Sequence, residues 1–155
     1  TGKDKILVEF PLFCYGTLIS SVVREKILGD QERLSIKPAS LKGYAVMKVA
    51  QAHYPALVKA AKDQVVLGVL VNGLSDIDMS ILDKFEGINY SREARSILAE
   101  DGSCTESFVY FPNKTLETAG QWTFGDWESS ELNLFLSQDF DIAGIRPPEV
   151  EPRLK

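Results

Sequence analysis

The chain has 155 residues and a formal net charge of −5, with 45% hydrophobic and 25% charged residues. This length predicts a single domain that buries a core without disulfides or metals. The acidic balance, without a basic run, argues against a nucleic-acid partner. No stretch approaches the roughly 18 apolar residues that a membrane span needs, so no membrane partner is expected.

Two cysteines and one histidine limit the chemistry open to the chain. Cys14 and Cys104 are far apart in the sequence and fit no metal-ligand spacing, so no metal site is expected. Isolated cysteines and the lack of a signal-peptide pattern predict a reducing, cytoplasmic setting. Any histidine-based triad would have to use His53.

The first elements are predicted between residues 6 and 29. Residues 6–15 form one apolar strand, or two short strands divided by Pro11. Apolar residues between Leu18 and Ile27 recur at helical spacing, and Gly29 ends that helix. The Tyr15-Gly16-Thr17-Leu18 segment is then a tight strand-to-helix turn. Its unpaired N–H groups can bind an anion or a developing oxyanion.

Residues 31–38 are polar and are expected to be a linker. Strands are predicted after it at 44–49, 54–58 and 65–71, because these runs are rich in strand-forming residues and are separated by turn-like residues. Gly68 lies inside the third strand. A glycine there indicates a bulge or the close approach of another backbone segment.

The helix in the centre of the chain has clear boundary signals. Ser75 and Asp78 have the spacing of a capping box, with Asp in place of the usual Glu. The helix is expected to continue to about Phe85, and Gly87 is a good C-terminal stop.

The later part of the chain is predicted to contain a hairpin and a final helix. Strands at 94–99 and 107–111 are joined by a turn at Asp101-Gly102, and the helix covers 122–135. Strands before, between and after three helices, without regular βαβ alternation, predict an α+β domain with a mixed, barrel-like sheet.

The expected domain covers residues 1–143. Residues 144–155 contain three prolines and few apolar residues, so they are expected to be an extended or disordered tail.

Glu86 is the strongest candidate for proton transfer. It lies at the margin of a helical face formed by Ile77, Ile81, Leu82 and Phe85. A carboxyl group there is partly desolvated, which raises its pKa toward the range useful for general acid/base catalysis. Asp83 lies nearly opposite that face and is expected in solvent. Position alone nevertheless favours the alternative that Glu86 is an ordinary solvent-exposed residue at a helix end.

For the other reactive residues, a structural interpretation is at least as well supported as a functional one. Tyr90 and Arg92 follow the helix and are placed to reach back toward Glu86, but a packed tyrosine and a surface arginine explain them equally well. Cys14 and His53 are a candidate nucleophile and base. Because Cys14 belongs to an apolar strand, an inert buried thiol is the favoured interpretation.

Taken together, these segments resemble the gamma-glutamylcyclotransferase-like family, and within it the branch of gamma-glutamylamine cyclotransferases and plant avirulence-induced-gene proteins. The similarity covers roughly residues 12–136. The blocks that carry it occur in the family order: Tyr15-Gly16-Thr17-Leu18, Leu41-Lys42-Gly43-Tyr44, Tyr54-Pro55-Ala56, Val66-Leu67-Gly68-Val69-Leu70, Leu82-Asp83-Lys84-Phe85-Glu86-Gly87 with Tyr90 and Arg92, and Trp122-Thr123-Phe124-Gly125-Asp126-Trp127. Cys14 departs from the pattern, since an aliphatic residue is usual there.

The resemblance implies a small mixed β-barrel with flanking helices. It also implies release of 5-oxoproline from a small gamma-glutamyl substrate, in which the α-amine attacks the γ-carbonyl and no cofactor is needed. Carried over, the general acid/base is Glu86, with Tyr90 and Arg92 as supporting residues. The substrate-binding residues are Tyr15, Gly16, Thr17, Leu18, Ile19 and Ser20. The alternative is a non-catalytic small-molecule-binding or stress-response module on the same fold.

Overall fold

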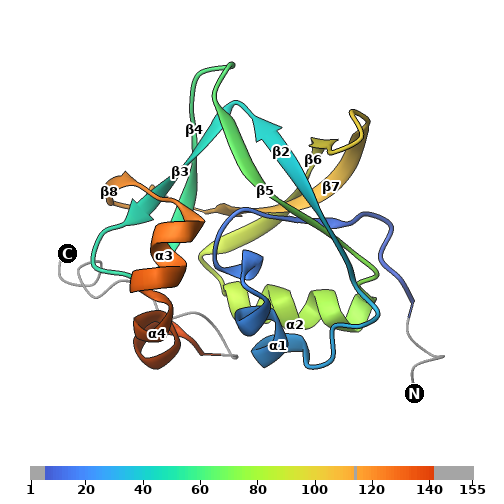
Figure 1. The fold of residues 1–155 in the computed structure, drawn as a ribbon, viewed down its shortest axis with the longest axis horizontal. Coiled ribbons are helices and arrows are strands. Elements are labelled where there is room, and N and C mark those ends of the chain that lie inside the picture. Colours follow the sequence, from blue (N-terminus) through green and yellow to red (C-terminus); the bar gives the residue numbers. More distant parts are fainter. Residues whose placement is uncertain (1–5, 114, 142–155) are drawn as a thin grey trace.

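A closed barrel of five strands is the centre of the computed structural model, which describes residues 6–113 and 115–141 (Figure 1). The barrel order is β1-β5-β2-β6-β7, and β4-β3-β8 form a second sheet. The barrel strands are β1 (Leu12–Cys14), β2 (Ser35–Lys42), β5 (Val65–Asn72), β6 (Tyr90–Ala99) and β7 (Cys104–Pro112). The smaller sheet contains β3 (Tyr44–Val49), β4 (Pro55–Lys59) and β8 (Thr118–Gln121).

Helices flank the sheets, so the α+β class with a small mixed barrel is confirmed (Figure 1). They are α1 (Ser21–Leu28), α2 (Asp76–Glu86), α3 (Phe124–Ser130) and α4 (Leu132–Leu134). In the described part of the chain, no helix is long and apolar enough to cross a membrane. The tail predicted at 144–155 lies outside the described residues.

The short strand β1 joins the two sides of the barrel. It pairs antiparallel with β5 and parallel with β7, where Leu12 lies opposite Phe108. A single strand over 6–15 was wrong, whereas the alternative of two short segments divided by Pro11 agrees with the structure, because β1 begins after Pro11 and Leu7 forms an isolated bridge with Ser75. Gly68 of β5 confirms the predicted close approach, since a Cβ atom there would lie 2.2 Å from the carbonyl oxygen of Cys14.

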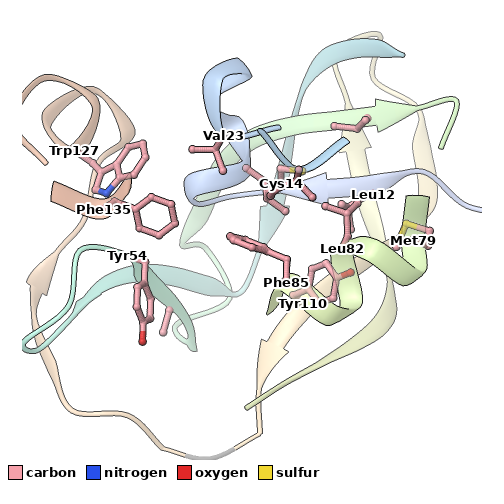
Figure 2. Packing of buried hydrophobic residues seen from close by; sticks show 14 of the residues in the cluster. Leu12, Cys14, Val23, Tyr54, Met79, Leu82, Phe85, Tyr110, Trp127 and Phe135 are labelled. Atoms are coloured by element: carbon pink, nitrogen blue, oxygen red, sulfur yellow. The ribbon is translucent and has the colours of Figure 1, made fainter. Parts of the chain in front are cut away.

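The side chains of β1 alternate between two cores, as the two-residue period of a strand requires. Phe13 packs inside the barrel with Ile97 and Val109. Leu12 and Cys14 point the other way, into a cluster between the barrel and the helices (Figure 2). One short segment therefore fixes the barrel relative to the helices and delivers the chain to the turn that follows it.

Strand β2 was missed in the sequence, where residues 31–38 were expected to be a linker. Its first four residues are exposed, so it lacks the alternating apolar pattern of a half-buried strand. Pro38 lies opposite Val69 of β5, while pairing with β6 is limited to Ala39 and Ser40. The missing N–H of proline therefore interrupts only one side of the ladder.

Helix α2 has the predicted boundaries. The Ser75 hydroxyl accepts a hydrogen bond from the Asp78 N–H, the Asp78 carboxylate accepts one from the Ser75 N–H, and Gly87 is the C-cap. The expected apolar face was wrong at Ile77, which is 47% exposed. Asp78 is buried in its place, because the capping box and an ion pair with Arg33 satisfy its carboxylate.

Two other helix predictions need correction. The helix expected from Leu18 is divided: Thr17–Ile19 form a 3-10 turn, and α1 begins after Ser20, whose hydroxyl accepts a hydrogen bond from Val23. The helix expected over 122–135 starts only at Phe124, after the N-cap Thr123. It is followed by α4 and by a π-helical turn, Phe135–Asp139.

Candidate active site

Both predicted motifs line one cavity at the end of β1. Tyr15, Gly16, Thr17 and Leu18 form one part of its wall, and Glu86 enters from the C-terminal end of α2. The other lining residues are Phe13, Cys14, Tyr54, Pro55, Tyr90 and Tyr110. Ile19, Ser20 and Arg92 were also predicted to belong to the site, but they lie outside this lining.

Several backbone carbonyl groups of the loop after β1 accept hydrogen bonds, which hold the loop in place. The carbonyls of Gly16 and Thr17 accept from Ile19 and Ser20 at 3.0 and 3.1 Å. Arg24 of α1 donates to the carbonyls of Leu18 and Ile19, both at 2.8 Å. The N–H groups that open the 3-10 turn have no partner inside that turn, so they are suited to bind an oxyanion or a carboxylate.

Arg24 was not singled out in the sequence, although it is nearly completely buried. Burial lowers the pKa of its guanidinium group, opposed by Cys14. The hydrogen bonds from Arg24 to the loop carbonyls compensate for this loss of solvation. Ser20, which was predicted to bind substrate, is the N-cap of the helix that carries Arg24.

Gly16 allows the opposite wall to close on the loop. A Cβ atom at this position would lie 3.0 Å from Cγ of Pro55, at the start of β4. A side chain here would push the 54–55 wall away from the loop.

Glu86 is half-buried, and the pKa of its carboxyl group is raised from 4.5 to about 8. Desolvation by burial is the main cause, and the negative charge of Asp83 adds to it. Glu86 therefore carries a proton in most molecules at pH 7. Its deprotonated form is a stronger base than an ordinary glutamate, so this group is suited to both accept and return a proton near neutral pH.

The alternative pair of Cys14 and His53 is not assembled in the structure. Burial raises the pKa of the Cys14 thiol to about 12, with Glu86 adding to the rise and Arg24 opposing it. A thiolate is therefore scarce at neutral pH. His53 lies outside the cavity lining that contains Cys14.

His53 instead links the cavity wall to the last helical segment. Its Nδ1 lies 2.9 Å from Oδ1 of Asp139, and its backbone N–H donates to Oδ2 at 2.8 Å. The indole N–H of Trp127 donates to the His53 carbonyl at 2.6 Å. These contacts hold the chain just before Tyr54 and Pro55, two of the lining residues.

Asp83 does not behave as the solvent-face residue expected from the helical wheel. Although its side chain is 42% exposed, its carboxylate accepts two hydrogen bonds from Arg92, at 2.9 and 3.0 Å. The hydroxyl of Tyr110 donates to the same carboxylate at 2.6 Å. Arg92, which was expected to reach Glu86, therefore contacts Asp83 one helical turn earlier.

The cavity itself is small. Its volume is about 30 Å³, which leaves room for one or two water molecules only. Five of its eleven lining residues are aromatic, so a ligand would exchange water for contact with aromatic side chains and with the loop. A molecule the size of a gamma-glutamyl group can enter only if part of the wall moves outward.

Comparison with known proteins agrees with this fold and with the placement of the motifs. Residues 12–129 match the family model described as "Gamma-glutamyl cyclotransferase, AIG2-like". The chain therefore belongs to the AIG2-like gamma-glutamyl cyclotransferase family, as the sequence motifs predicted.

Plant proteins are among its relatives. The chain is 26% identical to AIG2-like protein D of Arabidopsis thaliana over 136 residues, which are 85% of this chain and 88% of that protein. It is 28% identical to protein AIG2 C of the same plant over 128 residues, covering 81% and 76% of the two chains.

Solved structures share the fold at lower sequence identity. A solution structure from Arabidopsis thaliana aligns with a TM-score of 0.64 at 24% identity, covering 83% of this chain and 78% of the other. A structure titled "Gamma-glutamyl cyclotransferase" aligns with a TM-score of 0.61 at 14% identity, covering 90% and 89%. At these identities, the structural likeness establishes the fold alone.

Proposed function

We propose that this protein is a gamma-glutamyl cyclotransferase, which releases 5-oxoproline and a free amine or amino acid from a gamma-glutamyl amide. The observation that carries the proposal is the meeting of Glu86 and the Tyr15–Leu18 loop in one cavity. The raised pKa of Glu86 supports it, because the group can exchange a proton near neutral pH. Membership of the AIG2-like gamma-glutamyl cyclotransferase family supports the same reaction class.

The proposed reaction rearranges bonds within the substrate. The substrate's α-ammonium group gives a proton to the deprotonated Glu86, and the α-amine nitrogen attacks the γ-carbonyl carbon. The new carbon–nitrogen bond closes the 5-oxoproline ring, and the old amide carbon–nitrogen bond breaks. Glu86 returns its proton to the leaving nitrogen. The second proton, which the ring nitrogen loses as it becomes an amide, passes by the same carboxylate to the freed amine, which leaves as an ammonium ion, so the enzyme ends in its starting state.

Positioning supplies much of the catalysis in this scheme. Holding the amine against the carbonyl carbon is worth up to roughly 7–11 kcal/mol in favourable intramolecular systems. The loop N–H groups stabilise the oxyanion of the tetrahedral intermediate. Arg24 keeps the carbonyls of Leu18 and Ile19 engaged, so that the loop backbone retains its shape.

Binding of such a substrate requires the cavity to widen from about 30 Å³. The wall formed by Tyr54 and Pro55 is the segment proposed to move. Tyr54 directly precedes β4, an edge strand of the smaller sheet. Pro55 is the first residue of β4 and lies against Gly16. His53 stays in place during this movement, because its backbone N–H donates to Asp139, its Nδ1 lies within hydrogen-bond distance of the same carboxylate, and its carbonyl accepts from Trp127.

The test is a screen of gamma-glutamyl amines and dipeptides for release of 5-oxoproline by the wild-type chain and by Glu86→Gln. Glutamine keeps the shape of the side chain but cannot accept the α-ammonium proton. Turnover is expected to fall by about 10²–10⁴, the usual effect of losing a general acid/base, while substrate binding persists.

Glu25→Gln is the matched control, since it removes one carboxylate from an exposed position on α1. Near-normal turnover in Glu86→Gln would refute the assignment of the acid/base. Absence of release from every compound by the wild type would refute the enzyme and favour a binding module.

A further inference from the structure

Asp83 is the centre of a hydrogen-bonded network that connects three elements around the cavity. It accepts from Arg92 of β6 through two nitrogen atoms and from the Tyr110 hydroxyl of β7. The Tyr110 carbonyl in turn accepts from the hydroxyl of Tyr15, at 2.8 Å. Figure 2 shows Tyr110 among the packed residues beside α2. The network thus runs from α2 through β6 and β7 to the loop after β1.

Arg92 has the geometry of a fixed residue rather than a mobile surface arginine. Its guanidinium group lies over the ring of Phe108, 4.3 Å from the centroid, and it donates two hydrogen bonds to Asp83. A bidentate arginine–carboxylate pair with a stacked guanidinium loses little further entropy on ordering. The positive charge is therefore held against Asp83.

The charge of Asp83 acts on Glu86 because the two residues are three positions apart on one helix, where side chains are neighbours. Arg92 offsets part of that charge from the other side. The remaining ionisable groups around Glu86 come from other elements: Cys14 from β1, Tyr15 from the loop, Arg24 from α1 beside Cys14, Tyr54 from before β4, Tyr90 from β6 and Tyr110 from β7.

Tyr110 has a defined role in this arrangement. Since its hydroxyl proton is committed to Asp83, its phenol oxygen offers only lone pairs to any other group. Ionisation of Tyr110 is opposed strongly, because burial and the hydrogen bond to Asp83 both raise its pKa. It therefore stays neutral beside Glu86 across the working range of pH.

We propose that Asp83 and Arg92 form a positioning pair, which fixes Tyr110 in the cavity wall and sets the balance of charge at Glu86 during catalysis. The proposal rests on the cyclotransferase function proposed above and assigns roles to two residues that do not line the cavity. Neither residue takes or gives a proton. They act through Glu86 and Tyr110, so they are positioning residues rather than catalytic ones.

The proposal predicts the direction in which each substitution moves the acid limb of the pH profile of kcat/KM. This limb reports the protonation of Glu86 in the free enzyme. Asp83→Asn removes the neighbouring negative charge, so the limb should move to lower pH by about one unit. Arg92→Gln removes the positive charge that offsets the negative charge of Asp83, so the limb should move to higher pH. Arg92→Lys keeps the positive charge and should restore the limb to near its wild-type position.

Arg95→Gln is the matched control. Arg95 is on the same strand and lies over an aromatic ring, 4.6 Å from the centroid of Phe111, but it pairs with Glu93 away from Glu86. Its replacement should leave the limb in place. If Arg92→Gln does not fold, Arg92→Met, which keeps apolar contact with Phe108, replaces it.

A second measurement separates this proposal from the proposed function. Carbon-13 NMR titration of the glutamate carboxyl groups reports the protonation of Glu86 directly, with its signal identified by loss in Glu86→Gln. Opposite shifts of the Glu86 midpoint in Asp83→Asn and Arg92→Gln support the pair, even if no compound is turned over. Unchanged midpoints, or shifts in the same direction, would overturn it.

Discussion

Replacing Glu86 with glutamine should stabilise the fold at alkaline pH, at the same time as it removes turnover. The pKa of this carboxyl is about 8 in the folded chain, against 4.5 without the fold. The folded state therefore binds the proton more tightly than the unfolded state. The stability that this proton supplies is fully present below about pH 4.5, and it is lost as the pH rises through about 8.

The size of the effect follows from the pKa difference. Each pKa unit is worth about 1.4 kcal/mol, so the rise from 4.5 to about 8 would change the unfolding free energy of a fully buried carboxyl by at most about 5 kcal/mol. Glu86 is half-buried, and solvent screening reduces this to about 2–3 kcal/mol. Since 1 kcal/mol shifts the midpoint of a domain of this size by about 2–4 °C, Glu86→Gln should melt roughly 5–10 °C above wild type at pH 9.

The assay is denaturant and thermal unfolding of wild type and Glu86→Gln at intervals between pH 5 and 9. The difference in unfolding free energy should be small at pH 5, grow steadily up to about pH 8 and then level off. Glu25→Gln controls for the loss of one negative charge from the surface. Parallel curves for wild type and Glu86→Gln over the whole range would show that Glu86 has an ordinary proton affinity and would refute the reasoning.

Three further substitutions test the surroundings of the site. Cys14→Ala should cost about 1–2 kcal/mol of stability through lost core packing and leave turnover intact, so a folded variant without activity would argue for a thiol mechanism. Gly68→Ala should cost more than about 3 kcal/mol in denaturant unfolding, because its Cβ would lie 2.2 Å from the Cys14 carbonyl oxygen; normal stability would contradict this contact. Asp139→Ala removes both hydrogen bonds with His53, which directly precedes the cavity wall, and should raise KM more than it lowers kcat. Unchanged kinetics would show that these hydrogen bonds do not affect the cavity wall.

Local signals in the sequence predicted α2 and the residues at its two ends. The capping box at Ser75 and Asp78 and the stop at Gly87 depend on neighbours within a few residues, which is why they can be read from one segment. The same holds for the hairpin of β6 and β7, whose turn contains Gly102 at a positive φ of 91°. Gly68 was informative because a glycine inside a strand indicates a bulge or a close approach, and the structure has the close approach.

Elements stabilised by distant partners could not be predicted in this way. Strand β2 is held by ladders to β5 and β6, and its own residues are too polar and exposed to indicate a strand. Strand β8 has four exposed residues, so it shows no buried face at all. The helical wheel placed Asp83 in solvent because it contains no information about Arg92 or Tyr110, which come from other elements.

The same limit applies to the candidate site. Glu86 and the Tyr15–Leu18 loop were found from short motifs, and the structure places both in one cavity lining. Arg24 and Asp139 were missed, because each acts through backbone atoms of another segment. No pattern of residue types identifies such contacts before the fold is known.

The position of β1 also has a consequence for the order of assembly. This three-residue strand pairs with β5 and, through Leu12 and Phe108, with β7, so its partners are synthesised long after it. Such contacts between distant parts of the chain are slow to form, because closing a long loop costs entropy before the contacts compensate for it. A nascent chain that ends before β7 lacks Tyr110 and the parallel neighbour of β1. The cavity thus cannot precede closure of the barrel, and any activity regained on refolding should appear in the kinetic phase in which the barrel closes.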